Sequence, residues 1–553
     1  MTRPLVVAGA RLFTGRALHP SASAVAVRDG RIVAIGGLAE AREAAGPGAE
    51  VLDVPGGLVG PGFVDAHVHP AQGGGERLRC DLTDAVGAED TLARIRAYAD
   101  AHPDDEWIVG GGWHMADFER GLPRADALER VVPGRKVYLV NADHHGAWVS
   151  PAALAAAGID GDRADPADGH IDRDPDGAPS GTLQEGAMEL LADLLPVPTD
   201  AEHVAALDEA QRYLTGFGVT GWQDAIIGAY SGVRDPTDAY LAAIDAGRLS
   251  VLVSGALWLE RGIGVADVDR VVAGLVAARD RIGDRRGSAG GRFRATSVKI
   301  MLDGVPESRT AAMKAPYLDA DGRPTAETGS THFAPEVLDA VAPALAAAGF
   351  QLHIHAIGDR AVADALHAIE LANRVADGGR LRHHLAHLQQ VDLADVPGMA
   401  RSGATANLQA FWACRSDQMV DLNLPLVGRE RFEQQYAFAS MAAAGVPLAM
   451  GSDWPVSTPD PWQAIAVAVT RIEAGSLREP LGPHEALTLE QALTAYTAGS
   501  ARVAHHDEAG LLEVGRRADV AVADRDPFLQ PAEALHAVRT AATVSAGRVV
   551  HAR

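Results

Sequence analysis

The sequence predicts an α/β protein built on a (β/α)8 barrel, with a large insertion after the first barrel strand. A small β-sandwich made from both ends of the chain completes the prediction. Eight strand-like runs, most of them followed by Ala-rich helical stretches, are spread over the central part of the chain, a pattern typical of alternating strands and helices. Residues 72–212 interrupt this series after its first run, and short strand-like runs cluster near both termini.

The first 60 residues contain short runs rich in Val, Ile and Ala between Gly and Pro breaks, and Asp29-Gly30 is a strong hairpin-turn signal. Residues 505–553 show the same pattern. Because chain ends usually lie near one another, we expect residues 1–60 and 505–553 to form one composite β-sandwich domain. The barrel then occupies residues 61–504.

The eight predicted barrel strands are residues 62–69, 217–225, 249–258, 296–304, 349–359, 381–389, 403–411 and 446–454. Long structureless connections are uncommon inside compact domains. We therefore expect residues 72–212 to form an inserted subdomain. It leaves the barrel at the carboxyl end of the first strand, where barrel enzymes place their chemistry, so it should form a roof over the site.

His67 and His69 stand two residues apart in the first strand, followed by Pro70. Alternate side chains of a strand share a face, so both imidazoles can bind one divalent cation. Such a pair alone is common in proteins. Here further candidate ligands recur at or near the carboxyl ends of later strands: Lys299, His355, His387 and Asp453.

Lys299 is the unusual member of this set, because Val298, Ile300 and Met301 flank it. A lysine ion-paired within the core is one interpretation. The alternative follows from desolvation, which lowers the pKa of a buried amine and leaves it neutral and nucleophilic. A neutral amine can add CO2 to give a carbamate, a carboxylate-like group able to bridge two cations.

The segments HVH, HIHAIGD, LAHLQ and GSDWP, together with Lys299 in the fourth predicted strand, resemble the metal-dependent amidohydrolase superfamily. The segments at 303–317, 141–154 and 487–503 narrow the resemblance to amidohydrolase family 3, the branch that includes N-substituted formamide deformylases. The resemblance covers essentially the whole chain. Ala386 departs from it, since a Glu is expected there; we expect Ala386 to face away from the site.

The resemblance implies a hydrolase that cleaves a C–N bond of an amide or N-substituted formamide with a metal-activated hydroxide. It implies two divalent ions, expected to be zinc, bridged by carbamylated Lys299. One ion is held by His67, His69, Lys299 and Asp453, and the other by Lys299, His355 and His387. Asp453 is expected to be the catalytic proton shuttle, taking a proton from the attacking water and delivering it to the leaving nitrogen.

The resemblance implies that His145 is a substrate-contacting histidine of the roof, with an ordinary loop histidine as the alternative. Weaker candidates for substrate contact, with packing or surface exposure as the alternative, are Trp113, His114, Glu185, Arg309, Gln409 and Trp412. His353, His383 and His384 lie close to the ligands in sequence, and we interpret them as packed or ligand-supporting. Asp303 and Asp359 are expected to cap helices or to brace ligands. The segment 505–510, HHDEAG, is expected to be a solvated linker.

The bulk composition restricts the partners. A formal charge of −24 and a pI near 5.3 argue against a nucleic-acid or anionic-membrane surface. The chain has two cysteines and no apolar run long enough to span a bilayer, and its N-terminus lacks a convincing signal peptide. We therefore expect a cytoplasmic protein with a small-molecule substrate. A homodimer is expected only because homodimers are common among proteins in general.

Three alternatives stay open. A deaminase or a cyclic-amide hydrolase of the same superfamily is the nearest, although single-metal deaminases generally lack the bridging lysine. A non-catalytic homologue would be expected to have lost ligands, and none of the six is replaced here. A phosphate-containing substrate is disfavoured, because the segments after strands 7 and 8 hold no glycine-rich loop and only Arg415 as a nearby cation.

Overall fold

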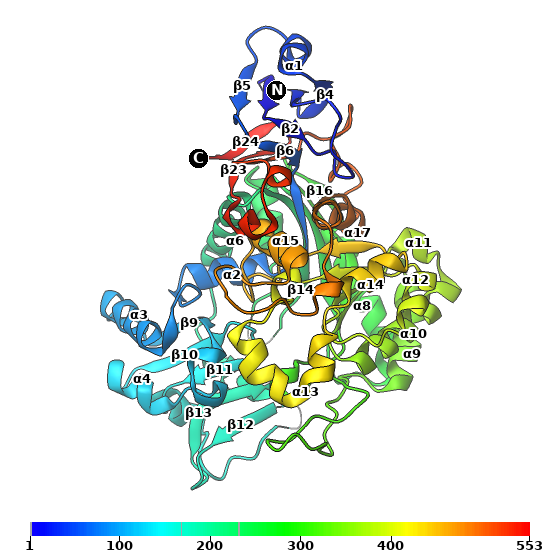
Figure 1. Cartoon of the computed structure of the whole chain (residues 1–553). Coiled ribbons are helices and arrows are strands. Elements are labelled where there is room, and N and C mark those ends of the chain that lie inside the picture. The colour runs from blue at the N-terminus through cyan, green and yellow to red at the C-terminus, as the bar shows by residue number, and fades with distance from the viewer. Residues whose placement is uncertain (1–2, 167–168, 231–232) are drawn as a thin grey trace.

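The computed structural model describes residues 3–166, 169–230 and 233–553. Eight parallel strands pair in the order in which they occur along the chain, and helices surround them (Figure 1). These strands are β7 (Phe63–Val68), β14 (Val219–Ile227), β15 (Leu252–Trp258), β17 (Arg292–Met301), β18 (Gln351–Ala356), β19 (His384–His387), β20 (Thr405–Leu408) and β21 (Leu448–Met450). A short strand, β16 (Asp284–Arg286), adds antiparallel to β17. The prediction of an eight-stranded barrel is confirmed.

The sheet comes close to closing between its first and last strands. The Asp453 backbone N–H donates to the His67 carbonyl over 2.7 Å, and the Ser452 N–H donates to the Asp65 carboxylate over 2.9 Å. Gly451 allows this approach, since a Cβ there would lie 2.5 Å from the His67 nitrogen. The segments that carry the first and last candidate ligands are therefore fixed against each other.

The helices around the barrel pack through apolar faces. In α10 (Asp359–Val375), for example, Val362, Ala365, Leu366 and Ile369 are buried at helical spacing. The other helices of this part are α2 (Pro70–Arg77), α6 (Asp200–Thr215), α7 (Thr237–Asp245), α8 (Val268–Ile282), α9 (Pro335–Ala347), α11 (Gly378–Leu381), α12 (Val396–Ser402), α13 (Leu424–Glu433), α14 (Phe438–Ala443), α15 (Pro461–Thr470), α16 (Leu489–Thr494) and α17 (Ser500–Val503).

A buried polar network fills the barrel near the amino ends of its strands. The Gln223 amide donates to Ser297 Oγ over 2.6 Å and to Gln351 Oε1 over 3.0 Å. Ser297 also donates to Gln351 Oε1 over 2.5 Å. These hydrogen bonds tie β14, β17 and β18 together inside the barrel.

Residues 72–212 contain a separate six-stranded sheet, ordered β12-β13-β11-β10-β9-β8 and lying beside the barrel (Figure 1). Its strands are β8 (Cys80–Asp81), β9 (Trp107–Trp113), β10 (Lys136–Asn141), β11 (Gly146–Val149), β12 (Gly169–Arg173) and β13 (Pro179–Glu185). The helices α3 (Gly87–Ala101), α4 (Ala125–Val131) and α5 (Pro151–Ala156) accompany it. The turn after β10 and the end of β13 bring His145 and Glu185 to the barrel mouth.

The two ends of the chain share a five-stranded sheet, ordered β2-β6-β22-β23-β24, at one end of the molecule (Figure 1). A four-stranded sheet, ordered β4-β3-β1-β5, lies next to it in the chain's first part. The strands are β1 (Leu5–Ala8), β2 (Arg11–Leu12), β3 (Ala24–Arg28), β4 (Arg31–Gly36), β5 (Glu50–Asp53), β6 (Leu58–Pro61), β22 (Val520–Ala523), β23 (Thr540–Ser545) and β24 (Arg548–Ala552), with helix α1 (Leu38–Ala45).

The segment 505–510 is not the solvated linker that its polar letters predict. His506 is only 1% exposed, and its Nε2 lies 3.2 Å from the Trp222 carbonyl oxygen. The carbonyl compensates for the burial of the ring, which explains why a polar residue is tolerated there. Cys80 and Cys414 are both free and buried. Within the described ranges, no helix has both the length and the apolar character that a membrane span requires.

Candidate metal centre

The carboxylate of Asp453 joins the two histidines of the first barrel strand. His67 lies in β7 and His69 directly precedes α2, and the Nε2 atoms of both lie 3.2 Å from Asp453 Oδ1. Among the described residues, this triad has ligand atoms within 4.8 Å of one another, close enough to hold one metal ion.

Asp453 follows β21 in a left-handed conformation, with φ of 58°. A non-glycine residue in this region costs free energy and persists where the surroundings enforce it, often at functional sites. Burial raises the pKa of Asp453, but the charges and hydrogen bonds of His67 and His69 outweigh burial and bring it well below its ordinary value. The carboxylate is therefore ionised and able to bind a cation.

Lys299 lies on β17 with its side chain inside the barrel. It is 2% exposed, and its Nζ is 3.2 Å from His67 Nε2. Burial lowers the pKa of Lys299 to about 8. An appreciable fraction of this amine is therefore neutral near neutral pH, which is the form that carbamate chemistry requires.

His355 on β18 and His387 at the end of β19 form the other half of the cluster, with ring centroids 4.2 Å apart. Both Nε2 atoms are buried without a hydrogen-bond partner. Burial lowers the pKa of both rings, to about 3 for His387, so both are neutral. Two adjacent neutral imidazoles with unpaired buried nitrogens fit a bound cation, which would supply the missing partner.

Neighbouring side chains fix the orientation of these ligands. His353 Nε2 lies 2.8 Å from His67 Nδ1, and Gln409 Oε1 accepts from the His387 backbone N–H over 2.6 Å. Asp303 accepts three backbone N–H groups and lies 3.7 Å from His355 Nε2. His353 thus supports a ligand directly, and Asp303 braces the loops beside His355.

The other two histidines of this region have partners away from the ligands. His383 Nδ1 accepts from the Leu352 backbone N–H over 2.9 Å, and His384 Nδ1 lies 3.3 Å from Asn407 Nδ2. Both are buried, and neither lines the cavity at the candidate ligands.

The six candidate ligands line one cavity of about 80 Å³, together with residues of the inserted segment. His145 is part of this wall, with its ring centroid 6.4 Å from that of His355. Its Nδ1 lies 2.9 Å from Glu185 Oε1. Burial lowers the pKa of His145, but Glu185 outweighs it and raises that pKa to about 9, while the pKa of Glu185 falls to about 2. The inserted segment therefore presents a charged imidazolium to the cavity.

The structure does not place the other candidates for substrate contact on this cavity wall. Trp113 is buried in the inserted segment, where its indole donates to the Leu139 carbonyl over 2.8 Å. His114 is exposed near Thr83, and Arg309 pairs with Glu327 over 2.7 Å. These side chains have partners elsewhere. Their closeness in sequence to the site motifs therefore does not place them at the cavity.

Gln409 and Trp412 also lie off the wall, although both follow β20. Gln409 acts on the His387 backbone as described above, and Trp412 is half-buried against the main hydrophobic core. Both are therefore corrected from substrate contacts to supporting residues.

Several wall residues are absent from the sequence-based set. His144 Nε2 lies 2.9 Å from Glu76 Oε1, and Asp143 and Gln72 stand near it on the wall. Gln72 follows His69 by about one helical turn in α2, a signal that the sequence does contain. Met188 comes from a 3-10 helix (Gly186–Leu194) and Tyr230 from the segment after β14, and only the tertiary structure reveals that both reach this wall.

Comparison with known proteins identifies the family to which the chain belongs. The sequence profile described as "Amidohydrolase family" matches residues 50–551. The chain belongs to this family. It is therefore a metal-dependent hydrolase with a TIM-barrel fold.

Two curated members of the amidohydrolase family match along nearly their whole length. YtcJ of Bacillus subtilis (strain 168), named as an amidohydrolase, is 30% identical over 96% of this chain and 96% of its own. The N-substituted formamide deformylase of Arthrobacter pascens is 29% identical over 95% of this chain and 94% of its own. A metal-dependent hydrolase of Pyrococcus horikoshii OT3 shares the fold, with a TM-score of 0.72 at 23% identity over 96% of this chain and 99% of its own.

Proposed function

We propose that this amidohydrolase uses two divalent metal ions to hydrolyse the C–N bond of a neutral N-substituted amide or formamide. The observation that carries the proposal is the pair of unpartnered Nε2 atoms of His355 and His387, which face the same cavity as Lys299 and the His67–Asp453 pair. One ion would explain the triad, and a second ion would give the unpartnered Nε2 atoms of His355 and His387 a partner of their own.

In this proposal, the two ions would be zinc, and carbamylated Lys299 would be a ligand of both. His67, His69 and Asp453 complete the first site, and His355 and His387 complete the second. Nitrogen ligands and carboxylates in this combination suit zinc. The low pKa of Lys299 supports its modification, because only the neutral amine reacts with CO2.

Bound metal lowers the pKa of water toward 7 and polarises a carbonyl oxygen. The residues of the chain supply the remaining functions. The ionised Asp453 carboxylate accepts the proton of the attacking water and then delivers it to the leaving nitrogen. His145, held as a cation by Glu185, donates a hydrogen bond toward the substrate from the roof.

Part of the cavity wall is apolar, beside the His145 cation. Ile226, Met188, Met301 and Val456 contribute apolar surface, and no arginine lines the cavity in the described part of the chain. The relative from Arthrobacter pascens is named for deformylation of N-substituted formamides. Both observations support a neutral amide over a phosphate or a multiply charged group.

A panel of substrates tests this proposal. N-benzylformamide, an N-acetyl amino acid, a cyclic ureide and a phosphotriester are assayed in parallel with the zinc-loaded protein. We expect the formamide or the acyl amide to be preferred. Preference for the ureide or the phosphotriester by more than about tenfold in kcat/KM, about 1.4 kcal/mol, would contradict the assignment.

We also propose that residues 1–60 and 505–553 form a composite β-sandwich domain separate from the barrel of residues 61–504. The shared sheet of β2, β6, β22, β23 and β24 and its own apolar cluster support this division. Residues 72–212 would then be the roof of the site, as the position of His145 suggests.

A further inference from the structure

A second cavity adjoins the metal centre and has no part in the function proposed above. It has a volume of about 240 Å³, three times that of the cavity at the candidate ligands. It lies between α2, α6, strands β9 and β10, and residues 195–198. Gln72, Val140 and Val233 line both cavities, so the two spaces are neighbours that share a wall.

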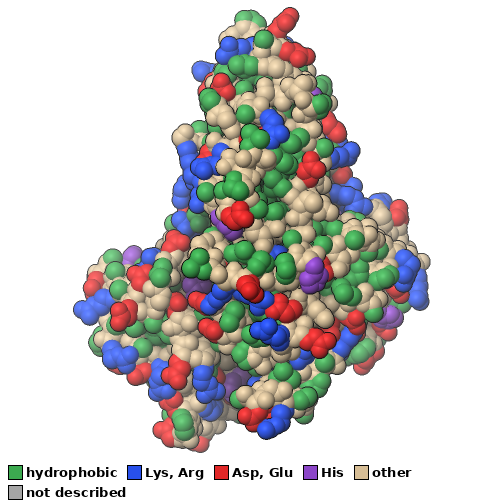
Figure 2. Space-filling model, viewed as in Figure 1, with side chains coloured by type: hydrophobic (Ala, Val, Ile, Leu, Met, Phe, Trp, Pro, Cys, Tyr) green, Lys and Arg blue, Asp and Glu red, His purple; other side chains and the backbone are tan. Residues whose placement is uncertain are grey.

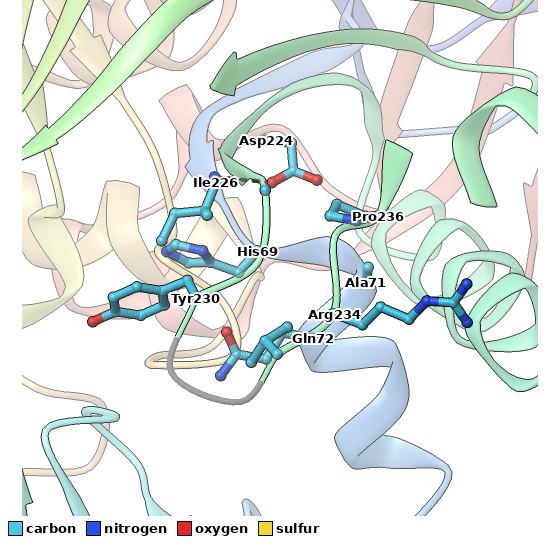
Figure 3. A pocket seen from close by; sticks show the side chains of 10 residues that line it. His69, Ala71, Gln72, Asp224, Ile226, Tyr230, Arg234 and Pro236 are labelled. Atoms are coloured by element: carbon cyan, nitrogen blue, oxygen red, sulfur yellow. Dashed lines mark hydrogen bonds between the residues drawn. The ribbon is translucent and has the colours of Figure 1, made fainter. Parts of the chain in front are cut away.

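A small pocket at the start of α2 shares wall residues with each of the two spaces. Figure 3 shows His69 and Tyr230 on one side of Gln72, with Ala71 and Arg234 on the other. His69 also lines the metal-centre cavity, whereas Ala71 and Arg234 also line the large one. The three spaces therefore adjoin one another around Gln72, which lines all of them.

The large cavity is mainly apolar. Its apolar wall consists of Ala71, Leu78, Val109, Tyr138, Val140, Leu195, Pro196, Pro198, Ala205, Ala206 and Val233. Two of its charged residues are already paired within the protein. Arg234 donates to the Pro198 carbonyl and pairs with Asp200, and Glu76 pairs with His144. Arg79 and Glu202 also line an outer cavity that opens between β9 and residues 194–196, so they mark the end of the space that faces solvent.

Helix α2 contains three consecutive glycines, and two of them are explained by close packing. A Cβ on Gly73 would lie 2.7 Å from the Trp454 ring, and one on Gly74 would lie 1.8 Å from the Ala206 carbonyl oxygen. A Cβ on Gly75 would meet only the Ala206 Cβ, at 3.8 Å, which is ordinary contact. Because glycine within a helix costs about 1 kcal/mol relative to alanine, packing gives no reason for Gly75. Gly75 lines the large cavity, and a larger residue there would reduce its volume.

We propose that this cavity binds a long apolar substituent of the substrate, so that the substrate class is an amide carrying a flexible alkyl chain. The inference rests on the proposed function and specifies its substrate. The 80 Å³ cavity has room for the reacting amide alone, whereas ordinary ligand pockets begin at about 300 Å³. Only with the adjoining cavity does the site reach that size. The apolar wall then gains free energy for each methylene group removed from water.

Two series of substrates test the inference and show on which side of the amide the chain lies. N-alkylformamides from methyl to octyl extend the amine side, and N-methylalkanamides of matching length extend the acyl side. We expect kcat/KM in one series to rise about fourfold per methylene, equivalent to about 0.8 kcal/mol, until the cavity is filled. Hydrolysis of short members with no dependence on length in either series would overturn the inference and leave the proposed function intact.

The variant Gly75→Leu tests the location of the chain. Its side chain enters the cavity without a backbone clash, so the rise in kcat/KM should stop several methylenes earlier than in the wild type. Gly274→Leu in α8 is the matched control, because a Cβ at Gly274 meets nothing within 4 Å and the residue lies far from both cavities. The same length dependence in both variants would show that the alkyl chain of the substrate does not bind in this cavity.

Binding of straight-chain alkylhydroxamates to the zinc-loaded protein keeps the inference testable if no amide is hydrolysed. Hydroxamates chelate the metal, and their dissociation constants, measured by calorimetry, should fall about fourfold per methylene. In Gly75→Leu the dissociation constant should stop falling at a shorter alkyl chain than in Gly274→Leu. Length-dependent binding without turnover would refute the proposed reaction and retain the alkyl-chain cavity. Dissociation constants that do not change with length would refute the cavity assignment.

Discussion

Removing the Asp303 carboxylate should destabilise the protein, because that side chain satisfies three backbone groups at once. Asp303 is fully buried after β17 and accepts the N–H groups of Ala312 over 2.9 Å, Ile357 over 3.0 Å and Gly358 over 2.9 Å. In Asp303→Ala these donors have no acceptor in the protein. The loops after β17 and β18 flank His355, and they would lose the hydrogen bonds that join them through Asp303.

The magnitude follows from the number of donors. A buried polar group left without a partner costs about 1–3 kcal/mol. Three such donors, partly hydrated by water that enters in place of the carboxylate, lower the free energy of unfolding by about 3–5 kcal/mol. Unfolding entropy is about 2.1 cal/mol/K per residue, and for 553 residues each kcal/mol lowers the melting temperature by about 1 °C. We therefore expect the melting temperature of Asp303→Ala to fall by about 3–5 °C.

Differential scanning calorimetry of the metal-loaded and metal-free proteins measures this shift. Asp359→Ala is the control, because Asp359 accepts a single backbone N–H, from the exposed Lys314, over 2.7 Å. That variant should stay within about 1 °C of the wild type. A shift below about 1 °C for Asp303→Ala in both forms would refute the idea that Asp303 braces these loops.

Three further predictions concern the site. Lys299→Ala should lose most of its bound metal and activity, with partial recovery in the presence of a short carboxylic acid; full metal content and turnover would exclude Lys299 as the bridge. Asp453→Asn should keep its fold and much of its metal but lose a factor of about 10² to 10⁴ in kcat, and near-normal kcat would exclude it as the proton shuttle. Glu185→Gln should lose about 3 kcal/mol of stability near pH 6, because it leaves the buried His145 cation unpaired. The raised pKa of His145 gives stability that is fully present below pH 6.5 and lost as the pH rises through about 9. The difference between wild type and Glu185→Gln should therefore shrink over that range in denaturant titrations, and a constant difference would refute the ion pair.

The barrel could be predicted from the sequence because its strands combine apolar runs with turn signals in a regular series. His67 and His69 share a face for the same reason, since alternation along a strand is a local property. The candidate ligands could likewise be placed at the carboxyl ends of strands, where a parallel barrel gathers them whatever their distance in the chain. Local pattern and topology were sufficient for these features.

The remaining wall residues depend on tertiary packing. Trp113 and Trp412 have the chemistry of a binding wall, but the sequence does not show that their rings pack into hydrophobic cores. Gln409 contacts a ligand's backbone instead of the cavity, a difference set by side-chain direction. His506 looks solvent-exposed in a polar segment, yet β14 covers it and supplies a carbonyl partner. Each error arises where contacts between distant segments decide burial.

The metal content of the purified wild-type chain tests the central claim most directly. The protein is loaded with excess zinc in the presence of bicarbonate and dialysed against metal-free buffer, and the ions per chain are then counted by inductively coupled plasma mass spectrometry. The proposed ligand set predicts two divalent ions per chain, because His355 and His387 form a second site beside the triad of His67, His69 and Asp453. One ion per chain at saturating zinc would contradict the two-metal mechanism, and none would contradict the metal centre itself.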